Sequence, residues 1–147
     1  MKPAQPFSHI MVCTDFSPGA ARAVAVGAQQ ARLDGARLSL VHVVAPGAPV
    51  LPQMAAKSAR VLDNHEVAHL CHQHMENCYG PDLSGLPVKM VLRRGHPVVE
   101  IVAQLEQDPA DLLVVGSQGL SGMGLILFGS VAERLARRAA CATLIAR

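Results

Sequence analysis

The stretch GSQGLSGMGLILFGS, residues 116–130, decides both the fold and the function that the sequence predicts. It follows the apolar run 111–115, DLLVV, which is typical of a buried strand, and it precedes residues 131–139, which have the pattern of a helix. Its glycines stand at positions 116, 119, 122, 124 and 129. Glycines let the backbone approach a ligand closely, and a helix N-terminus adds unsatisfied N–H donors and the positive end of the helix dipole. The stretch therefore predicts a phosphate-binding connection between a strand and a helix.

Two common phosphate-binding motifs do not fit this stretch. A P-loop needs G-x-x-x-x-G-K-[ST], and residues 116–130 contain no lysine. A dinucleotide fingerprint needs G-x-G-x-x-G, whereas the G-x-G at 122–124 has no third glycine at the required spacing. What remains is G-x-x-G, nine residues and then G-S, formed by Gly116, Gly119, Gly129 and Ser130. A glycine-rich turn without a ligand would explain the same residues.

Composition narrows the class of protein. The chain has 147 residues, of which 50% are hydrophobic and 16% charged, and we expect one folded domain over residues 1–147. A net charge of +2 and only four aromatic residues argue against a nucleic-acid partner. No apolar run reaches the roughly 20 residues of a membrane span, and the N-terminus lacks the pattern of a signal peptide. We therefore expect a cytoplasmic protein without membrane association, whose four cysteines are free thiols.

Strand and helix patterns alternate along the whole chain. We expect strands at 9–15, 37–45, 88–93, 111–115 and 142–146, and helices at 18–32, 54–77, 97–108 and 131–139. This alternation predicts an α/β fold, a doubly wound five-stranded parallel sheet with helices on both faces, as in Rossmann-like proteins. The expected strand order is 3-2-1-4-5, which places the reversal of strand order between the first and fourth strands.

The reversal point brings two distant segments together. The carboxyl ends of the first and fourth strands would place Cys13 and Asp15 beside Gly116. Asp15 is then positioned to accept hydrogen bonds from ribose hydroxyls, while the loop amides and Ser130 hold phosphates. The alternative role for Asp15 is to cap the turn before Pro18, because aspartate is common in turns.

The chain resembles the universal stress protein family over nearly its whole length. The resemblance rests on IMVCTDFS at 10–17, LVHV at 40–43, GHP at 95–97, DLLVVGS at 111–117 and the G-x-x-G and G-S spacing. In ATP-binding members it implies that Asp15 meets the ribose and that the Val43 backbone contacts the adenine edge. The candidate binding residues are Cys13, Asp15, Val43, Gly116, Ser117, Gly119, Gly129, Ser130 and Val131. The implied ligand is ATP or another adenine nucleotide, with or without Mg²⁺.

The loop departs from the family in its charge. Gln118 stands where a His or Arg is usual, and residues 119–128 contain no charged side chain. A triphosphate would depend on amides, the helix dipole, Arg134 or a bound Mg²⁺. Each lost charge-assisted hydrogen bond is worth about 1.5–3 kcal/mol, so losing one or two lowers affinity by orders of magnitude. AMP or another adenine nucleotide is therefore an alternative ligand.

The function that these patterns predict is that of a nucleotide-binding stress-response regulator or sensor. We expect a homodimer formed through residues 142–146, an apolar terminal edge, and a protein partner that the sequence does not identify. We expect no catalytic residues and at most slow ATP hydrolysis. The alternative is a nucleotide-free interaction module that docks through the apolar loop 125–128, LILF.

Residues 65–69, HEVAH, match the H-E-x-x-H pattern of zinc proteases. The extended protease motif is absent, because positions 72 and 75 are His and Met. His65, His69, His72 and Glu76 nevertheless share one stripe of the expected helix and are candidate metal ligands, which a second helix or subunit would have to complete. A solvated helix border explains the same pattern without metal.

Overall fold

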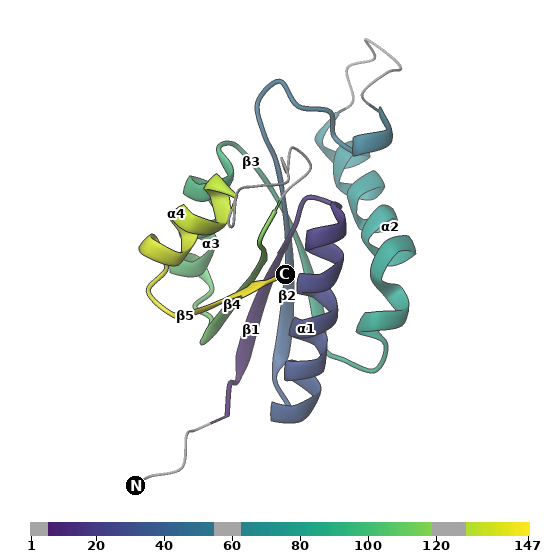
Figure 1. Ribbon diagram of the computed structural model, residues 1–147. Coiled ribbons are helices and arrows are strands. Elements are labelled where there is room, and N and C mark those ends of the chain that lie inside the picture. Colours follow the sequence, from purple (N-terminus) through teal and green to yellow (C-terminus); the bar gives the residue numbers. More distant parts are fainter. Residues whose placement is uncertain (1–5, 55–62, 119–128) are drawn as a thin grey trace, which may run out of the picture.

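The computed structural model describes residues 6–54, 63–118 and 129–147 (Figure 1). The strands are β1 (His9–Thr14), β2 (Arg37–Val44), β3 (Val88–Arg94), β4 (Leu112–Gly116) and β5 (Ala142–Ala146). The α-helices are α1 (Pro18–Asp34), α2 (Asn64–Leu83), α3 (Pro97–Gln107) and α4 (Ser130–Arg138), and Pro52–Met54 forms the single-turn 3-10 helix η1. Strands and helices alternate in the expected order.

All five strands are parallel, and their order β3-β2-β1-β4-β5 confirms the predicted 3-2-1-4-5 topology. Helices α1 and α2 cover one face of the sheet, while α3 and α4 cover the other (Figure 1). In β1, Ile10 and Val12 pack toward α1, whereas Met11 packs toward α3 and α4. Because both faces are buried, the central strands are apolar without alternation.

Helix α1 begins and ends as its sequence predicts. Ser17 is the N-cap, and its Oγ accepts a hydrogen bond from the Ala20 amide at 3.1 Å. Pro18 occupies the first helical turn, and Gly35 ends the helix with a left-handed φ of 66°. These caps fix the position of the helix N-terminus beside the carboxyl end of β1.

The predicted helix 54–77 is wrong at both ends. Helix α2 begins at Asn64, because Asp63 and Glu66 form a capping box: each side chain accepts a hydrogen bond from the other's backbone amide, at 2.8 and 3.0 Å. Pro52–Met54 belongs to η1, and residues 55–62 lie outside the described part of the chain.

The glycine and proline at 80–81 do not end α2, as the sequence suggested. The helix continues to Leu83 because Met75, Tyr79 and Leu83 are all buried on the face toward the sheet, which outweighs the hydrogen bond lost at Pro81. The other boundaries differ from the prediction by two residues or fewer. No helix in the described ranges is long and apolar enough to cross a membrane.

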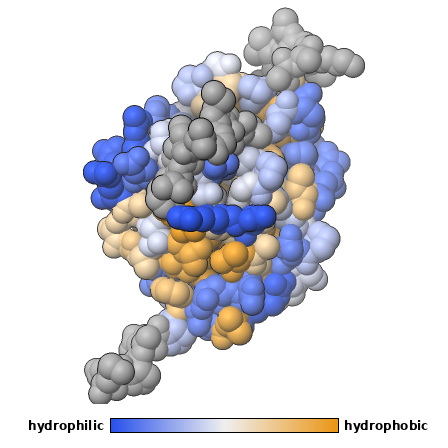
Figure 2. Space-filling view, in the orientation of Figure 1, coloured by the Kyte–Doolittle hydropathy of each residue, from blue (hydrophilic) through white to orange (hydrophobic). Residues whose placement is uncertain are grey.

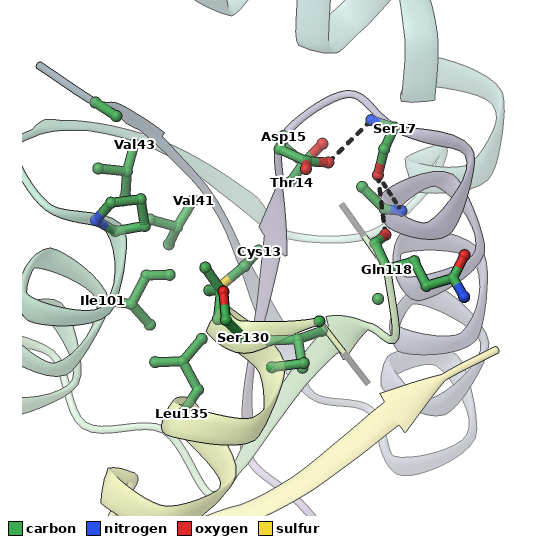
Figure 3. A pocket seen from close by; sticks show the side chains of 18 of the residues that line it. Cys13, Thr14, Asp15, Ser17, Val41, Val43, Ile101, Gln118, Ser130 and Leu135 are labelled. Atoms are coloured by element: carbon green, nitrogen blue, oxygen red, sulfur yellow. Dashed lines mark hydrogen bonds between the residues drawn. The ribbon is translucent and has the colours of Figure 1, made fainter. Parts of the chain in front are cut away.

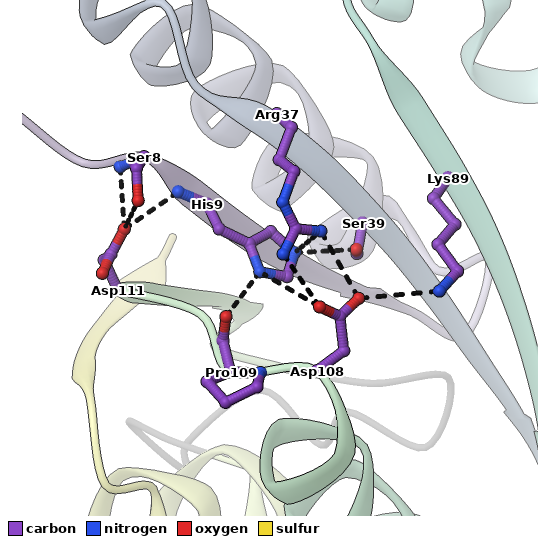
Figure 4. Close-up of polar contacts among 8 residues, drawn as sticks. All are labelled: Ser8, His9, Arg37, Ser39, Lys89, Asp108, Pro109 and Asp111. Carbon is purple, nitrogen blue, oxygen red and sulfur yellow. Dashed lines mark hydrogen bonds and ion pairs between the residues drawn. The ribbon is translucent and has the colours of Figure 1, made fainter.

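A polar network ties the amino ends of the strands together (Figure 4). The buried His9 donates from Nδ1 to the Pro109 carbonyl at 2.7 Å, and its Nε2 lies 2.8 Å from Ser39 Oγ. The Arg37 guanidinium donates to the Asp108 carboxylate at 2.8 Å and, with His9 and Lys89 nearby, lowers the pKa of that carboxyl. This network closes the end of the sheet opposite to the candidate site.

A pocket at the carboxyl ends of the strands

A cavity of about 460 Å³ lies at the reversal of strand order, where β1 is flanked by β2 and β4 (Figure 3). Its walls come from the carboxyl ends of these three strands and from the first turns of α1, α3 and α4. Cys13, Thr14 and Asp15 line it together with Gly116, although a hundred residues of sequence separate them. The topology thus produces the meeting of segments that the strand order requires.

One side of the pocket is polar and belongs to the turn between β1 and α1. Asp15 Oδ1 accepts a hydrogen bond from the Ser17 amide at 3.0 Å, so Asp15 has the turn-capping role that the sequence allowed. Ser17 Oγ lies 3.5 Å from the Gln118 carbonyl and links this turn to the segment after β4. Asp15 also lines the cavity, and the turn bond therefore holds its carboxylate at the pocket wall.

Phe16, between Asp15 and Ser17, has a left-handed backbone with φ of 64°, a conformation that residues other than glycine rarely adopt. Its amide donates to Thr14 Oγ1 at 2.9 Å, and that hydroxyl lies 2.6 Å from the Tyr79 hydroxyl of α2. The Phe16 ring contacts His42, His74 and Tyr79 with centroid separations of 4.7, 4.5 and 6.1 Å. The strained turn at the site is thus held by packing against α2, a feature that the sequence analysis missed.

The other side of the pocket is apolar. Figure 3 shows Val41, Val43, Ile101 and Leu135 facing the cavity opposite Asp15 and Ser17. Alanines 45 and 48 and Pro97 extend this wall. A flat aromatic group fits such a surface, because its faces need no hydrogen bonds.

The sequence analysis named only Val43 of this apolar wall, but periodicity could have found the rest. Val41 is two residues before Val43 on the same strand face, and Leu135 is one helical turn after Val131. Ile101 follows Pro97 by one turn of α3 in the same way.

Gly116 has a packing role that differs from the predicted one. A Cβ at this position would lie 2.7 Å from the carbonyl carbon and oxygen of Gly19 and 3.0 Å from the Ala20 amide. A Cβ on Gly19 would in turn collide with the Gln118 carbonyl. These glycines allow the first turn of α1 to pack directly on the end of β4.

Two amides that were expected to hold phosphate are already bonded within the protein. The Ser117 amide donates to the Ala146 carbonyl at 2.7 Å, and the Gly129 amide donates to the Ser117 carbonyl at 2.5 Å. The first turn of α4 is different, because the leading N–H groups of a helix have no partner within it, and no side chain caps this helix. That turn forms part of the pocket wall through Ser130, Val131 and Ala132. The α4 N-terminus is therefore a candidate anion-binding element of the pocket.

The predicted site residues divide into three groups. Those that line the pocket are Cys13, Asp15, Val43, Gly116, Gly129, Ser130 and Val131. Ser117 is buried next to the pocket and is absent from its wall. Gly119 lies outside the described residues, as does the apolar loop 125–128.

The described wall of the pocket carries little charge. Asp15 is its one acidic residue, and no lysine, arginine or histidine from the described ranges contributes to it. Burial raises the pKa of the Cys13 thiol to about 12, with a smaller contribution from Cys141, so this thiol stays neutral. The field at the site comes mainly from one carboxylate and from the N-terminal dipole ends of the helices that line it.

The candidate metal ligands on α2 do not form a compact cluster. His65, His69 and Glu76 are exposed, and His72 Nε2 lies 3.3 Å from the Met90 carbonyl of β3. Across the parts of the chain that the structure describes, no group of three or more His, Cys, Asp or Glu side chains could hold a metal ion. The helix border explains the stripe of histidines without a metal.

Comparison with known families gives a match over almost the whole chain. The model of the universal stress protein family matches residues 6–147. A universal stress protein of Thermus aquaticus is 30% identical over 144 residues, which cover 96% of this chain and 99% of the relative.

Solved structures give the same result for the fold. The universal stress protein UspA from Lactobacillus plantarum superposes with a TM-score of 0.77 at 24% identity, covering 99% of this chain and 100% of its own. A universal stress protein in complex with cAMP gives 0.69 at 25% identity, covering 97% and 98%. One from Archaeoglobus fulgidus in complex with dAMP gives 0.64 at 22% identity, covering 97% and 99%.

Proposed function

Because the chain belongs to the universal stress protein family, we propose that its pocket binds an adenine nucleotide and that the protein is a stress-response regulator or sensor. The observation that carries the proposal is the division of the pocket into an apolar wall, a carboxylate and a helix N-terminus. These three features match the base, the ribose and the phosphate of a nucleotide. We propose the cytoplasm as its location, since that compartment keeps the four cysteines reduced.

The nucleotide has one orientation that satisfies all three features. Adenine lies against Val41, Ile101 and Leu135, with its polar edge toward the Val43 backbone. The ribose hydroxyls donate to Asp15, and the phosphate accepts hydrogen bonds from the amides of Ser130 and Val131 at the start of α4. The relatives solved with cAMP and dAMP support an adenine nucleotide as the ligand class. ATP with Mg²⁺ is one member of this class.

A regulatory role agrees better with the pocket than catalysis does. A hydrolase needs a base placed beside a nucleophile or a positioned water. Asp15 instead accepts from the Ser17 amide, and the Cys13 thiol is neutral. We therefore expect at most slow ATP hydrolysis, which a single-turnover assay with labelled ATP would measure.

We also propose that the protein is a homodimer formed through β5. This strand is an edge of the sheet, and its backbone groups on the outer side can pair with a second copy. Figure 2 shows apolar surface beside β5, where Thr143, Leu144 and Ile145 are partly exposed. Sedimentation equilibrium should give twice the 15.5 kDa mass of the chain, and a single-chain mass at all concentrations would refute the dimer.

Calorimetric titration with ATP and AMP tests nucleotide binding. Asp15→Asn should weaken binding about tenfold or more, because it removes a charged acceptor from the ribose. Ser130→Ala should weaken it by about twofold to tenfold, because it removes one neutral hydroxyl at the phosphate.

The matched control for Asp15→Asn is Asp82→Asn, the same chemical change at an exposed position of α2. It should leave the affinity unchanged. If neither ATP nor AMP bound at millimolar concentration, the proposed function would be refuted. Equal effects of Asp15→Asn and Asp82→Asn on the affinity would refute it as well.

A further inference from the structure

We propose that the pocket selects adenine nucleotides with a single phosphate over those with two or three. This inference rests on the proposed function and narrows its ligand. The shared chemistry is an adenosine unit with one phosphate ester, as in AMP or cyclic AMP. It follows from the charge and the donors of this chain's own pocket.

The first observation is the absence of a counter-charge from the described wall. None of the lysines and arginines in residues 6–54, 63–118 and 129–147 lines the cavity. Residues 119–128 are GLSGMGLILF and contribute no charged side chain in any conformation. Asp15, the one ionised group in the described wall, repels every additional negative charge.

Two cations near α4 are also poor counter-ions for a phosphate chain. Arg137 is paired with Glu133 of the same helix at 3.0 Å. Arg134 is exposed and is not part of the pocket wall, although Ser130, one turn before it, is. An arginine in that position gains little by leaving water.

The second observation concerns how many amides remain for phosphate. The amides of Ser117 and Gly129 donate to protein carbonyls, so that, where β4 leads to α4, the described donors are those of the uncapped first turn of α4. One turn of helix can surround one phosphate group, and its dipole compensates about half an elementary charge. A single phosphate therefore matches the donors that the described first turn of α4 offers.

Each further phosphate adds negative charge, and the described wall adds no cation to meet it. A terminal phosphate carries a charge of nearly −2 at neutral pH, and a diester such as cyclic AMP carries a single charge. Sites that bind triphosphates tightly place Lys or Arg on the outer phosphates, and each such contact is worth about tenfold or more in affinity. Without one, ATP binds through the same adenosine and single-phosphate contacts as AMP while suffering additional repulsion.

The test is a set of calorimetric titrations of the full chain with adenosine, AMP, cyclic AMP and ATP with Mg²⁺. We expect AMP or cyclic AMP, whichever binds more tightly, to bind at least tenfold more tightly than Mg-ATP and than adenosine. The comparison of AMP with cyclic AMP identifies which ester the pocket takes. The inference would be overturned if Mg-ATP bound as tightly as the tighter-binding of AMP and cyclic AMP. It would also be overturned if adenosine bound as tightly as that nucleotide. Binding of none of the four would refute the proposed function itself.

A gain-of-function pair makes the test independent of loss of fold. Gln118→Arg places a cation at the pocket wall, and Gln118→Met is the neutral control that removes the same amide. The arginine variant should bind Mg-ATP at least tenfold more tightly than the methionine variant does. The affinities of the two variants for AMP should differ by less than about threefold. Equal affinities of the two variants for Mg-ATP would contradict the proposal. Arg134→Ala should leave the ratio of AMP to ATP affinity unchanged, and a further loss of ATP affinity would show that Arg134 already serves the outer phosphates.

Discussion

Replacing Gly116 with alanine should destabilise the protein although the change adds only one methyl group. The new Cβ would lie 2.7 Å from the Gly19 carbonyl and 3.0 Å from the Ala20 amide, inside the contact distance of real Cβ atoms. Both neighbours are backbone atoms, so no side-chain rotation relieves the overlap. The first turn of α1 must move away from β4, and overpacking of this kind costs about 1–3 kcal/mol.

The matched control is Gly80→Ala in α2. Apart from its chain neighbours, a Cβ at Gly80 meets nothing within 4 Å. The gain in helix propensity of about 0.5–1 kcal/mol is offset by Pro81, whose ring restricts a preceding residue that has a Cβ. The same chemical change should therefore destabilise the protein at position 116 and have little effect at position 80. Urea unfolding should give free energies of unfolding that differ between the two variants by about 1–3 kcal/mol.

The displacement at Gly116 should also reach the pocket. Because α1 carries Ser17 at its N-cap, a shift of its first turn moves the bond that holds Asp15. We expect weaker AMP binding in Gly116→Ala at temperatures where it is fully folded, and unchanged binding in Gly80→Ala. A Gly116→Ala variant within about 0.5 kcal/mol of the parent protein would refute the steric reasoning, since surface substitutions without effect fall in that range.

Three further predictions concern stability and reactivity. Tyr79→Phe should lower the free energy of unfolding by about 1–2 kcal/mol in a urea titration, because it removes the 2.6 Å hydrogen bond to the buried Thr14 hydroxyl; an unchanged value would contradict this. The Arg37 guanidinium lowers the pKa of Asp108 below its usual 3.8, so the stability from this pair is present above that value and is lost as the pH falls through the lowered pKa; Asp108→Asn should therefore flatten the fall in melting temperature between about pH 5 and pH 3, and an equal fall would exclude the pair as its source. Alkylation of the native protein followed by mass spectrometry should modify the exposed Cys78 first and Cys71 only after unfolding, because Cys71 is fully buried and burial raises its pKa to about 11; simultaneous labelling would show that α2 opens readily.

The sequence predicts the sheet well because its signals are local. Strands buried on both faces are continuous apolar runs, and the caps of α1 at Ser17 and Gly35 are visible as single residues. The end of α2 is not a local matter. Glycine and proline at 80–81 favour a break, whereas burial of Tyr79 and Leu83 against the sheet favours helix, and only the tertiary structure decides between them.

The sequence predicts the position of the site better than it predicts the role of each residue there. Topology alone places residues 13–15 beside Gly116, because parallel strands end at one edge. The sequence cannot reveal that the amides of Ser117 and Gly129 are bonded to carbonyls, since those bonds join segments that meet only in the fold. It also assigns Gly116 to ligand contact, whereas the packing of α1 is sufficient reason for a glycine there.

The turn at Asp15 shows why the site depends on parts of the chain that never touch a ligand. A left-handed backbone at a residue other than glycine costs about 1–2 kcal/mol. Phe16 therefore keeps this conformation only because its contacts offset the strain. The ring contacts of the half-buried Phe16 with His42, His74 and Tyr79 offset this strain, together with the hydrogen bond from its amide to Thr14 Oγ1. It follows that the position of the Asp15 carboxylate is set jointly by the β1 end and by α2. Changes in α2 that loosen the aromatic contacts should therefore alter nucleotide affinity, although α2 contributes no described residue to the pocket wall.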